Sequence, residues 1–338
     1  MNNSHNRSLF KSVNLITLIA VYILILVGGI VRSVGAGMGC PDWPKCFGQY
    51  VPPNSIEALP SNYQEVYAEK RIEKNKRLAR VLNTLGFESL SNQVINSPGV
   101  RAETVFSPLK AKVEYINRII GVLIGLFIII NFWYSLKLRK INYWIPTNGA
   151  LALALVIFQG WVGSLVVSTN LLPGFITFHM LLALLLVAIL LIQRFLILGN
   201  NHVYGNSWIV SVLLFLTLVQ IILGTGVREQ IDVFNASGLS RLEWIPSLGV
   251  KFYVHRSFSI LVLVLSVLLF YKNWNRERNN QLLILIGGVV LMEILLGIIL
   301  SYGGMPPFAQ PLHLLLGTIS FGALFYLFLE QNFKIETI

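Results

Sequence analysis

Three histidines lie at similar depths near the start of long apolar segments. His179, His255 and His313 each fall within the first few residues of such a segment. At a rise of about 1.5 Å per residue, each imidazole would lie roughly 5 to 8 Å inside the end of its helix. His255 and His313 belong to the same half of the chain, so their rings could meet at one level of a helical bundle. Two imidazoles in that arrangement could bind a haem iron from both faces.

Other interpretations of these histidines stay open. Each ring could simply hydrogen-bond to a neighbouring helix. A zinc site is disfavoured, because no cysteine or carboxylate cluster would complete a tetrahedral set of ligands. His5 and His202 lie in a terminal tail and a loop, where we expect solvated side chains. The matched positions of His255 and His313 favour haem ligation.

Two apolar segments begin with nearly the same four residues. One starts with YINR (115–118) and the other with YVHR (253–256). The third residue differs, because Asn117 stands where the second motif has His255. An amide lacks the imidazole nitrogen that ligates haem iron, so the two positions predict different chemistry.

Charged side chains accompany these motifs. Arg118 and Arg256 follow directly, where each could pair with a haem propionate or only snorkel to lipid headgroups. Glu114 lies about one helical turn before Asn117 and Arg118, so it can share their helix face. Glu293 lies deeper, where an ionised carboxylate would cost about 3 kcal/mol. We therefore interpret Glu114, at histidine depth, as the better candidate for chemistry.

Cys40 and Cys46 are the only cysteines in the chain. Both fall in a long loop that the charge pattern places in an oxidising compartment, so we expect a disulfide. The bond could be a structural staple, or a reducible pair that passes electrons or holds a substrate. The residue types leave both alternatives open.

Composition predicts the elements that position these residues. The chain has 338 residues, of which 55% are hydrophobic and 12% charged. Long uncharged runs indicate helices that cross about 30 Å of hydrocarbon, and a window of about 19 residues predicts eight of them. They lie at approximately 13–32, 113–134, 147–167, 174–198, 208–227, 252–272, 281–300 and 311–330.

Positive charges predict the orientation. The short connections 168–173 and 301–310 carry no Lys or Arg, whereas the tails and loops on the opposite side do. Both termini are therefore expected in the cytoplasm, in a multi-pass protein of a bacterial inner membrane with no cleavable signal peptide. This anchoring accounts for the net charge of +11. Nucleic-acid binding is not expected, because the charges do not cluster on one soluble face.

The sequence also contains an internal duplication. The matched pairs are GGIVR (28–32) with GTGVR (224–228), YINR with YVHR, QGWVG (159–163) with EILLG (293–297), and 172–183 with 305–317. We predict an all-α polytopic membrane protein made of two four-helix bundles, related by a pseudo-two-fold axis along the membrane normal. The bundles are expected at 1–198, which includes a long outer loop at 33–112, and at 199–338. The charged stretch in that loop reads as a solvated helix that serves as a lid or spacer.

Four motifs carry a resemblance to a known family. They are GGIVRSVGAGMGCPDWPKC (28–46), EYINR (114–118), HRSFS (255–259) and PLHLLLG (311–317). With the duplication, they make the chain resemble the haem A synthases, the CtaA/Cox15 family, over essentially all eight segments. The resemblance implies an oxidoreductase that makes haem A for cytochrome oxidase by oxidising a methyl group of haem O to a formyl group.

The resemblance also implies residue roles. It assigns a bound haem b to the C-terminal half, with His255 and His313 as axial ligands. It places the substrate haem O in the N-terminal half, with His179 as a ligand, Glu114 essential nearby and the outer-loop cysteines assisting.

Asn117 departs from that pattern, which has a histidine there, paired with the position of His179. Either His179 alone holds the substrate haem, leaving an open iron position that faces Asn117 and Glu114, or the N-terminal half has lost its haem chemistry. We prefer the first hypothesis, because Glu114, Arg118 and His179 are all retained. An open position would also give an oxidant a place to bind, where Asn117 could hydrogen-bond to it.

Two rival functions remain. A bis-histidine haem b cytochrome would transfer electrons without oxidising a substrate. A transporter would carry its polar groups near the membrane midplane, whereas these residues gather near the outer rim. The lipid bilayer is the expected surrounding. Whether the chain contacts a haem O synthase or the cytochrome oxidase assembly machinery, or forms a homo-oligomer, stays open.

Overall fold

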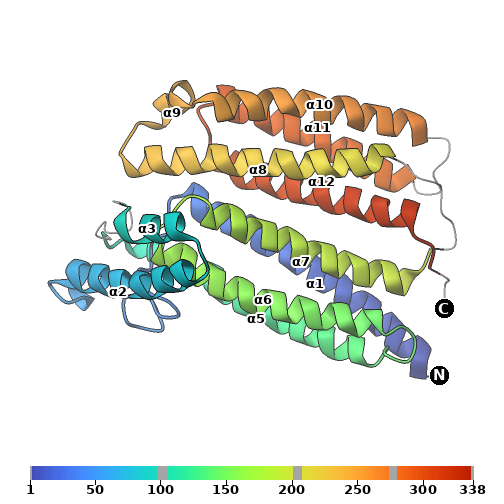
Figure 1. Ribbon diagram of the computed structural model, residues 1–338, viewed down its shortest axis with the longest axis horizontal. Helices are drawn as coiled ribbons and strands as arrows, with labels where there is room; N and C mark the ends of the chain where they lie inside the picture. The colour runs from blue at the N-terminus through green and yellow to red at the C-terminus, as the bar shows by residue number, and fades with distance from the viewer. Residues whose placement is uncertain (1, 98–104, 201–207, 274–279, 336–338) are drawn as a thin grey trace. The chain divides into compact units, whose positions relative to one another are not determined.

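The computed structural model describes residues 2–97, 105–200, 208–273 and 280–335. Within these ranges the chain forms eleven α-helices and one 3₁₀ helix (Ile56–Ala58), with no strand. Eight helices are long and apolar enough to cross a membrane, which confirms the prediction of an all-α polytopic protein. They are α1 (Asn2–Ser33), α5 (Pro108–Leu136), α6 (Trp144–Ser168), α7 (Phe175–Leu198), α8 (Trp208–Ala236), α10 (Val250–Asn273), α11 (Asn280–Tyr302) and α12 (Ala309–Asn332) (Figure 1).

Several of these helices extend beyond the predicted apolar segments. Helix α1 begins at Asn2 rather than near residue 13, and α8 continues to Ala236 rather than ending near residue 227. A hydropathy window detects the part of a helix that matches the hydrocarbon thickness. The hydrogen bonds within a helix continue past that limit, so the window underestimates helix length.

The described chain divides into two compact units. One contains 1–30, 123–157 and 181–338, and we call it the bundle unit. The other contains 31–122 and 158–180, and we call it the loop unit. The expected division at residue 198 and the pseudo-two-fold axis follow from the sequence repeat, and both stay predictions.

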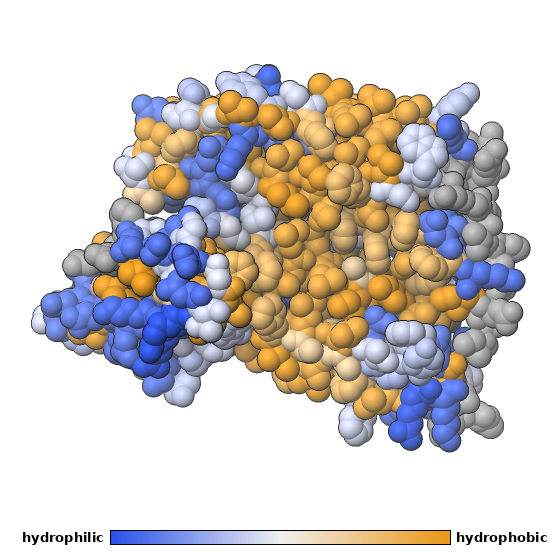
Figure 2. Space-filling model, viewed as in Figure 1, coloured by the Kyte–Doolittle hydropathy of each residue, from blue (hydrophilic) through white to orange (hydrophobic). Residues whose placement is uncertain are grey.

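In the bundle unit, helices α8, α10, α11 and α12 lie side by side (Figure 1). Their shared core is aliphatic, and Leu213, Leu269, Leu283 and Leu324 are almost fully buried in it. Many of their outward-facing side chains are also apolar. In the view of Figure 2, hydrophobic residues cover much of the middle of the long helices. A bundle that is apolar both inside and outside is stable only where lipid replaces water.

Small residues let two helices of the bundle unit approach closely. A Cβ added at Gly29 of α1 would lie 3.0 Å from the Cβ of Pro311 on α12. A Cβ added at Gly322 of α12 would overlap the hydroxyl oxygen of Tyr22 on α1. Lipid gives little hydrophobic drive for helix association, so close van der Waals packing at small residues supplies much of it.

The loop unit carries helices that do not span a membrane. Helix α2 (Tyr63–Thr84) and helix α3 (Glu88–Asn96) pack against each other (Figure 1). Their outer surface is hydrophilic in Figure 2. In the bundle unit, a further short helix, α9 (Arg241–Ser247), lies in the connection between α8 and α10. At its start, the Glu243 carboxylate accepts a hydrogen bond from the backbone N–H of Ser240.

Candidate functional site

Two predicted iron ligands meet in the bundle unit. His255 on α10 and His313 on α12 have ring centroids 6.3 Å apart, with their planes 88° to each other. The Nδ1 atom of each ring is buried and has no hydrogen-bond partner among the described residues. A metal held about 2 Å from a nitrogen of each ring would separate the centroids by about 6 Å. The pair therefore fits an iron that is bound from both faces.

Glycines on the neighbouring helices make room for these rings. A Cβ at Gly224 of α8 would lie 3.0 Å from Cε1 of His255. A Cβ at Gly297 of α11 would lie 3.9 Å from Cε1 of His313. The side-chain amide of Gln220, one turn before Gly224, donates a hydrogen bond to the backbone carbonyl of His255 at 3.0 Å. Helix α8 thus fixes both the ring and the backbone of His255.

Replacing Gly224 with Ala is expected to displace the His255 ring, because the new methyl group must push it aside. An off-rotamer imidazole costs about 1 kcal/mol, so haem affinity should fall by roughly fivefold. Visible and electron paramagnetic resonance spectra of the purified protein would report the distortion. Gly297→Ala is the matched control, because its methyl group makes only ordinary contact. A G224A protein with the spectra and haem content of the wild type would contradict this account of the site.

Arg256, which directly follows His255, contacts aromatic rings of its own helix. Its side chain is exposed and rests over the aromatic rings of Phe252 and Tyr253, at 5.8 and 5.7 Å from their centroids. These contacts are typical of a cation that snorkels along its own helix. A role for Arg256 in binding a propionate stays a prediction.

In the loop unit, Glu114 and Arg118 form an ion pair along one face of α5. Both side chains are largely buried, at 5% and 12% exposed. Glu114 also accepts a hydrogen bond from the backbone N–H of Cys40 at 2.9 Å. The sequence correctly placed Glu114 and Arg118 on one helix face, but it did not indicate that Glu114 would contact the cysteine loop.

Arg118 binds the same loop through backbone carbonyls. Its Nη1 donates to the carbonyls of Asp42 and Lys45, both at 2.8 Å, and its Nη2 donates to the carbonyl of Cys40 at 3.2 Å. Together with Glu114, these acceptors engage the two terminal nitrogens of the guanidinium group. Arg118 therefore holds the loop in place. A role for Arg118 in binding a propionate stays a prediction.

Cys40 and Cys46 form a disulfide bond, as expected. Both cysteines are fully buried in an aromatic cluster with Phe47, Tyr63 and Tyr67. The Asp42 carboxylate accepts hydrogen bonds from the backbone N–H groups of the next turn, at Phe47 and Gly48. A soluble reductant would have to open this cluster to reach either sulfur, so the burial favours a structural staple over a reducible pair.

His179 and Asn117 also belong to the loop unit. A Cβ at Gly163 of α6 would lie 3.5 Å from Cε1 of His179, and Gln159 donates a long hydrogen bond of 3.4 Å to its backbone carbonyl. Nδ1 of His179 and Oδ1 of Asn117 are buried without hydrogen-bond partners among the described residues. These two atoms are the kind of orphaned polar groups that a bound ligand would satisfy.

The three histidine positions share a signal that our reading of the sequence missed. A glutamine or glutamate precedes each packing glycine by four residues, in QGWVG (159–163), QIILG (220–224) and EILLG (293–297). Because residues four apart share a helix face, the pattern supplies both a polar group and space for a ring. The corresponding segment of the first repeat is LILVG (24–28), which has leucine at the polar position. The first repeat therefore departs from the pattern at two positions. Leu24 stands where the second repeat has Gln220, and Asn117 stands where it has His255.

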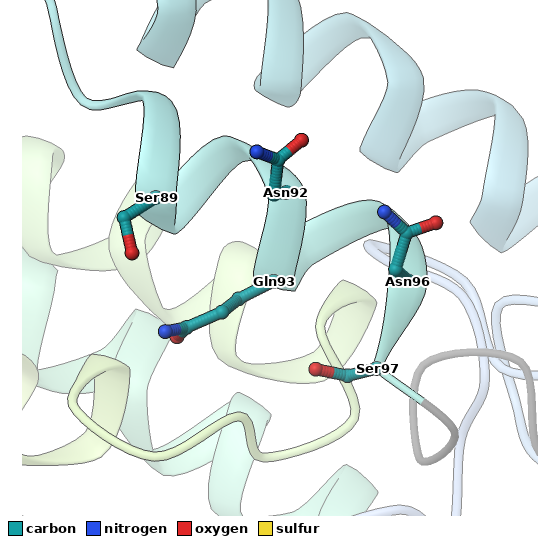
Figure 3. A pocket seen from close by; sticks show the side chains of 5 residues that line it. All are labelled: Ser89, Asn92, Gln93, Asn96 and Ser97. Atoms are coloured by element: carbon teal, nitrogen blue, oxygen red, sulfur yellow. The ribbon is translucent and has the colours of Figure 1, made fainter.

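Clusters of metal-binding side chains and surface hollows were the other candidates for a site. No group of three or more His, Cys, Asp or Glu side chains gathers among the described residues. A shallow hollow of about 550 Å³ on α3 is lined by Ser89, Asn92, Gln93, Asn96 and Ser97 (Figure 3). The hydroxyl and amide groups that line this hollow do not ionise near neutral pH, so they supply no general acid or base.

The chain is similar to known proteins over most of its length. The family model described as "Cytochrome oxidase assembly protein" (COX15-CtaA) matches residues 11–79 and 92–325. A haem A synthase of Shewanella oneidensis is 25% identical over 317 residues, covering 84% of each chain. One of Ehrlichia canis is 27% identical, covering 61% of this chain and 56% of its own. One of a Wolbachia strain from Brugia malayi is 24% identical, covering 90% of this chain and 91% of its own. Since the family model spans most of its length, the chain belongs to the COX15-CtaA family of cytochrome oxidase assembly proteins.

Proposed function

We propose that the chain is a haem A synthase, a membrane oxidoreductase that converts a methyl group of haem O to the formyl group of haem A. The observation that carries the proposal is the facing pair His255 and His313, in a chain whose relatives are named haem A synthases. Haem O is the substrate, and the lipid bilayer is the medium in which it is bound.

The paired imidazoles would hold haem b as the resident cofactor. When bound, haem b would supply one-electron redox chemistry. His255 and His313 provide two neutral nitrogen ligands, and Gly224 and Gln220 fix the position of the first. Because both imidazoles would be used to hold haem b, oxidation of the haem O methyl group would take place at a different site.

The loop unit contains the residues that would act on haem O. His179 offers a single imidazole ligand, held by Gly163 and Gln159. Asn117 carries a buried side-chain carbonyl oxygen, which can accept a hydrogen bond from an O–H group of a molecule bound next to the substrate. Glu114 is a buried carboxylate on the same helix, one turn before Asn117, and can hold or pass a proton. The disulfide loop shields this carboxylate from water through the bonds to Glu114 and Arg118.

The finer assignments form part of this proposal. The two four-helix halves, 1–198 and 199–338, would bind the substrate and haem b, respectively. Both termini would lie in the cytoplasm, with the chain in a bacterial inner membrane and the loop 33–112 on the outer side. Contacts with a haem O synthase or an oxidase assembly complex, and formation of a homo-oligomer, would serve the transfer of a poorly soluble substrate.

The decisive experiment is to co-express the chain with a haem O synthase in a host that lacks haem A. Chromatography of extracted haems should then reveal haem A, and omitting the haem O synthase should abolish it. A chain that binds haem b but leaves haem O unchanged would instead be the electron-transfer cytochrome.

Replacing Asn117 with His is expected to change the spectrum of the substrate-loaded site. Because an imidazole is a much better iron ligand than an amide, a high-spin, singly ligated haem should become low-spin. Low-temperature spectra of wild-type and variant proteins loaded with haem O would show the shift. Asn117→Gln is the control, because it adds no ligand. An unchanged spectrum in N117H would overturn the open-iron hypothesis.

A further inference from the structure

Helix α2 buries one face of a strongly charged sequence. We expected this stretch to be a solvated lid or spacer, and its outer face is indeed exposed. The opposite face, however, buries Arg71 and Asn75 to 3% and 1% exposure, with Leu78 in an apolar cluster that includes Leu165 and Leu172. Burying polar side chains is costly unless they have specific partners, so this face has a more demanding role than a spacer.

Lys74 reaches from this face to α6. Its Nζ donates to the carbonyl and hydroxyl oxygens of Ser164, at 3.3 and 3.5 Å. The next residue, Asn75, donates a hydrogen bond of 2.7 Å to the backbone carbonyl of Ser168, the last residue of α6. Asn75 therefore supplies a donor to a carbonyl at the C-terminus of this helix. Ser164 directly follows Gly163, which packs against His179. The ammonium group of Lys74 therefore contacts the turn of α6 that contains Gly163, the glycine next to the His179 ring.

The environment of Lys74 contains a second cation and no carboxylate partner. Among the described residues, the Lys74 ammonium group hydrogen-bonds only to Ser164 and forms no ion pair. Burial lowers the pKa of the Lys74 ammonium, and the nearby charge of Arg118 lowers it further. The carboxylate of Glu114 is already paired with Arg118. A half-buried lysine beside an arginine would gain stability from an added anion.

Arg118 itself is poorly placed to provide a new contact. Its terminal nitrogens are committed to loop carbonyls and Glu114, as described above. The Lys74 contacts to Ser164 are long and neutral, and an incoming carboxylate could replace them with a stronger charge-assisted bond. The two cations thus divide the work, with one fixing the loop and the other remaining available to a ligand.

We propose that Lys74 binds a carboxylate of the substrate porphyrin at the His179 site. This inference rests on the proposed function, because it requires a porphyrin at His179. Helix α2 would then be a lid that brings a cation to the substrate rather than a passive spacer. The recognised chemistry is a carboxylate on an otherwise apolar ring, which a compact ammonium can meet from many directions.

The test compares two porphyrin probes on the full-length protein in lipid nanodiscs. Haemin carries two carboxylates, and its dimethyl ester carries none. With the C-terminal site already filled, the binding signal of interest is the part that disappears in a His179→Ala variant. Lys74→Gln should weaken this His179-dependent binding of haemin by roughly tenfold or more and leave ester binding unchanged. Lys74→Arg should restore most of the haemin affinity.

Lys76→Gln is the matched control, because it removes an equal charge from the exposed face of the same helix. It should change neither affinity. Equal losses for haemin and its ester in K74Q would show a packing role for Lys74 and overturn the inference, as would unchanged haemin binding. A loss seen only in nanodiscs containing phosphatidylglycerol would assign Lys74 to a lipid headgroup instead. If wild-type protein shows no His179-dependent binding at all, the proposed function fails along with this inference.

Discussion

His313→Ala should remove the low-spin haem signal of the purified protein. The substitution takes away one of two imidazoles whose rings lie 6.3 Å apart, and alanine offers no ligand in its place. Loss of groups that merely support a metal ligand costs 10- to 100-fold, so loss of a ligand should lower haem b affinity by more than about 100-fold. The haem would be absent or five-coordinate and high-spin, and haem A production should fall below detection. Absorbance and electron paramagnetic resonance spectra would measure the change.

Two comparisons make this result specific. His5→Ala removes an exposed histidine from the first turns of α1 and should leave the spectrum unchanged. His255→Ala should reproduce the His313→Ala spectrum, because in the proposed site the two rings would share one iron. Retention of the wild-type low-spin signal in both His255→Ala and His313→Ala would contradict the assignment of the pair. The His179→Ala variant should keep the haem b signal and lose only the substrate signal.

Glu114→Ala should be both inactive and unstable. The substitution leaves Arg118 buried without its carboxylate and removes the acceptor for the backbone N–H of Cys40. Breaking a buried ion pair from one side costs about 3 to 5 kcal/mol. The cysteine loop should therefore detach, and the disulfide should become reducible under mild conditions. Thermal unfolding in detergent and the rate of thiol labelling after mild reduction would measure the two effects.

Glu114→Gln separates structure from chemistry at this position. Glutamine keeps an oxygen that can accept from Cys40, but it carries no charge and cannot transfer a proton at neutral pH. We expect E114Q to hold the cysteine loop better than E114A does. We expect both variants to produce equally little haem A. Arg118→Met should detach the loop as Glu114→Ala does, because it removes the donors to three loop carbonyls. Full haem A production by E114Q would rule out a chemical role for this carboxylate.

Local features of the sequence were sufficient for much of the fold. The eight apolar segments predicted the eight long helices, because hydrocarbon thickness sets a length that any window can detect. The one-turn spacing of Glu114 and Arg118 predicted a shared helix face, and the structure pairs them. The two cysteines in an outer loop predicted the disulfide. Each of these predictions depends on residues that are near one another in the sequence.

The partners of the charged residues depended on the tertiary structure. Arg118 and Arg256 occupy equivalent motifs, yet one clamps a loop and the other lies exposed over its own helix's aromatic rings. The sequence could not separate them, because the acceptors of Arg118 are backbone carbonyls, which every residue has. Their direction is fixed only when the loop folds.

The sequence by itself determined a helical membrane protein with three histidines at the starts of its helices and one disulfide. Only the tertiary structure decided which rings face each other, which glycines make room for them, and that α2 brings Lys74 to the end of α6. The physical reason is that hydropathy and helical periodicity act within one segment. Contacts between segments depend on side-chain shape and on the direction of individual hydrogen-bond donors, and these are set only when distant parts of the chain pack together.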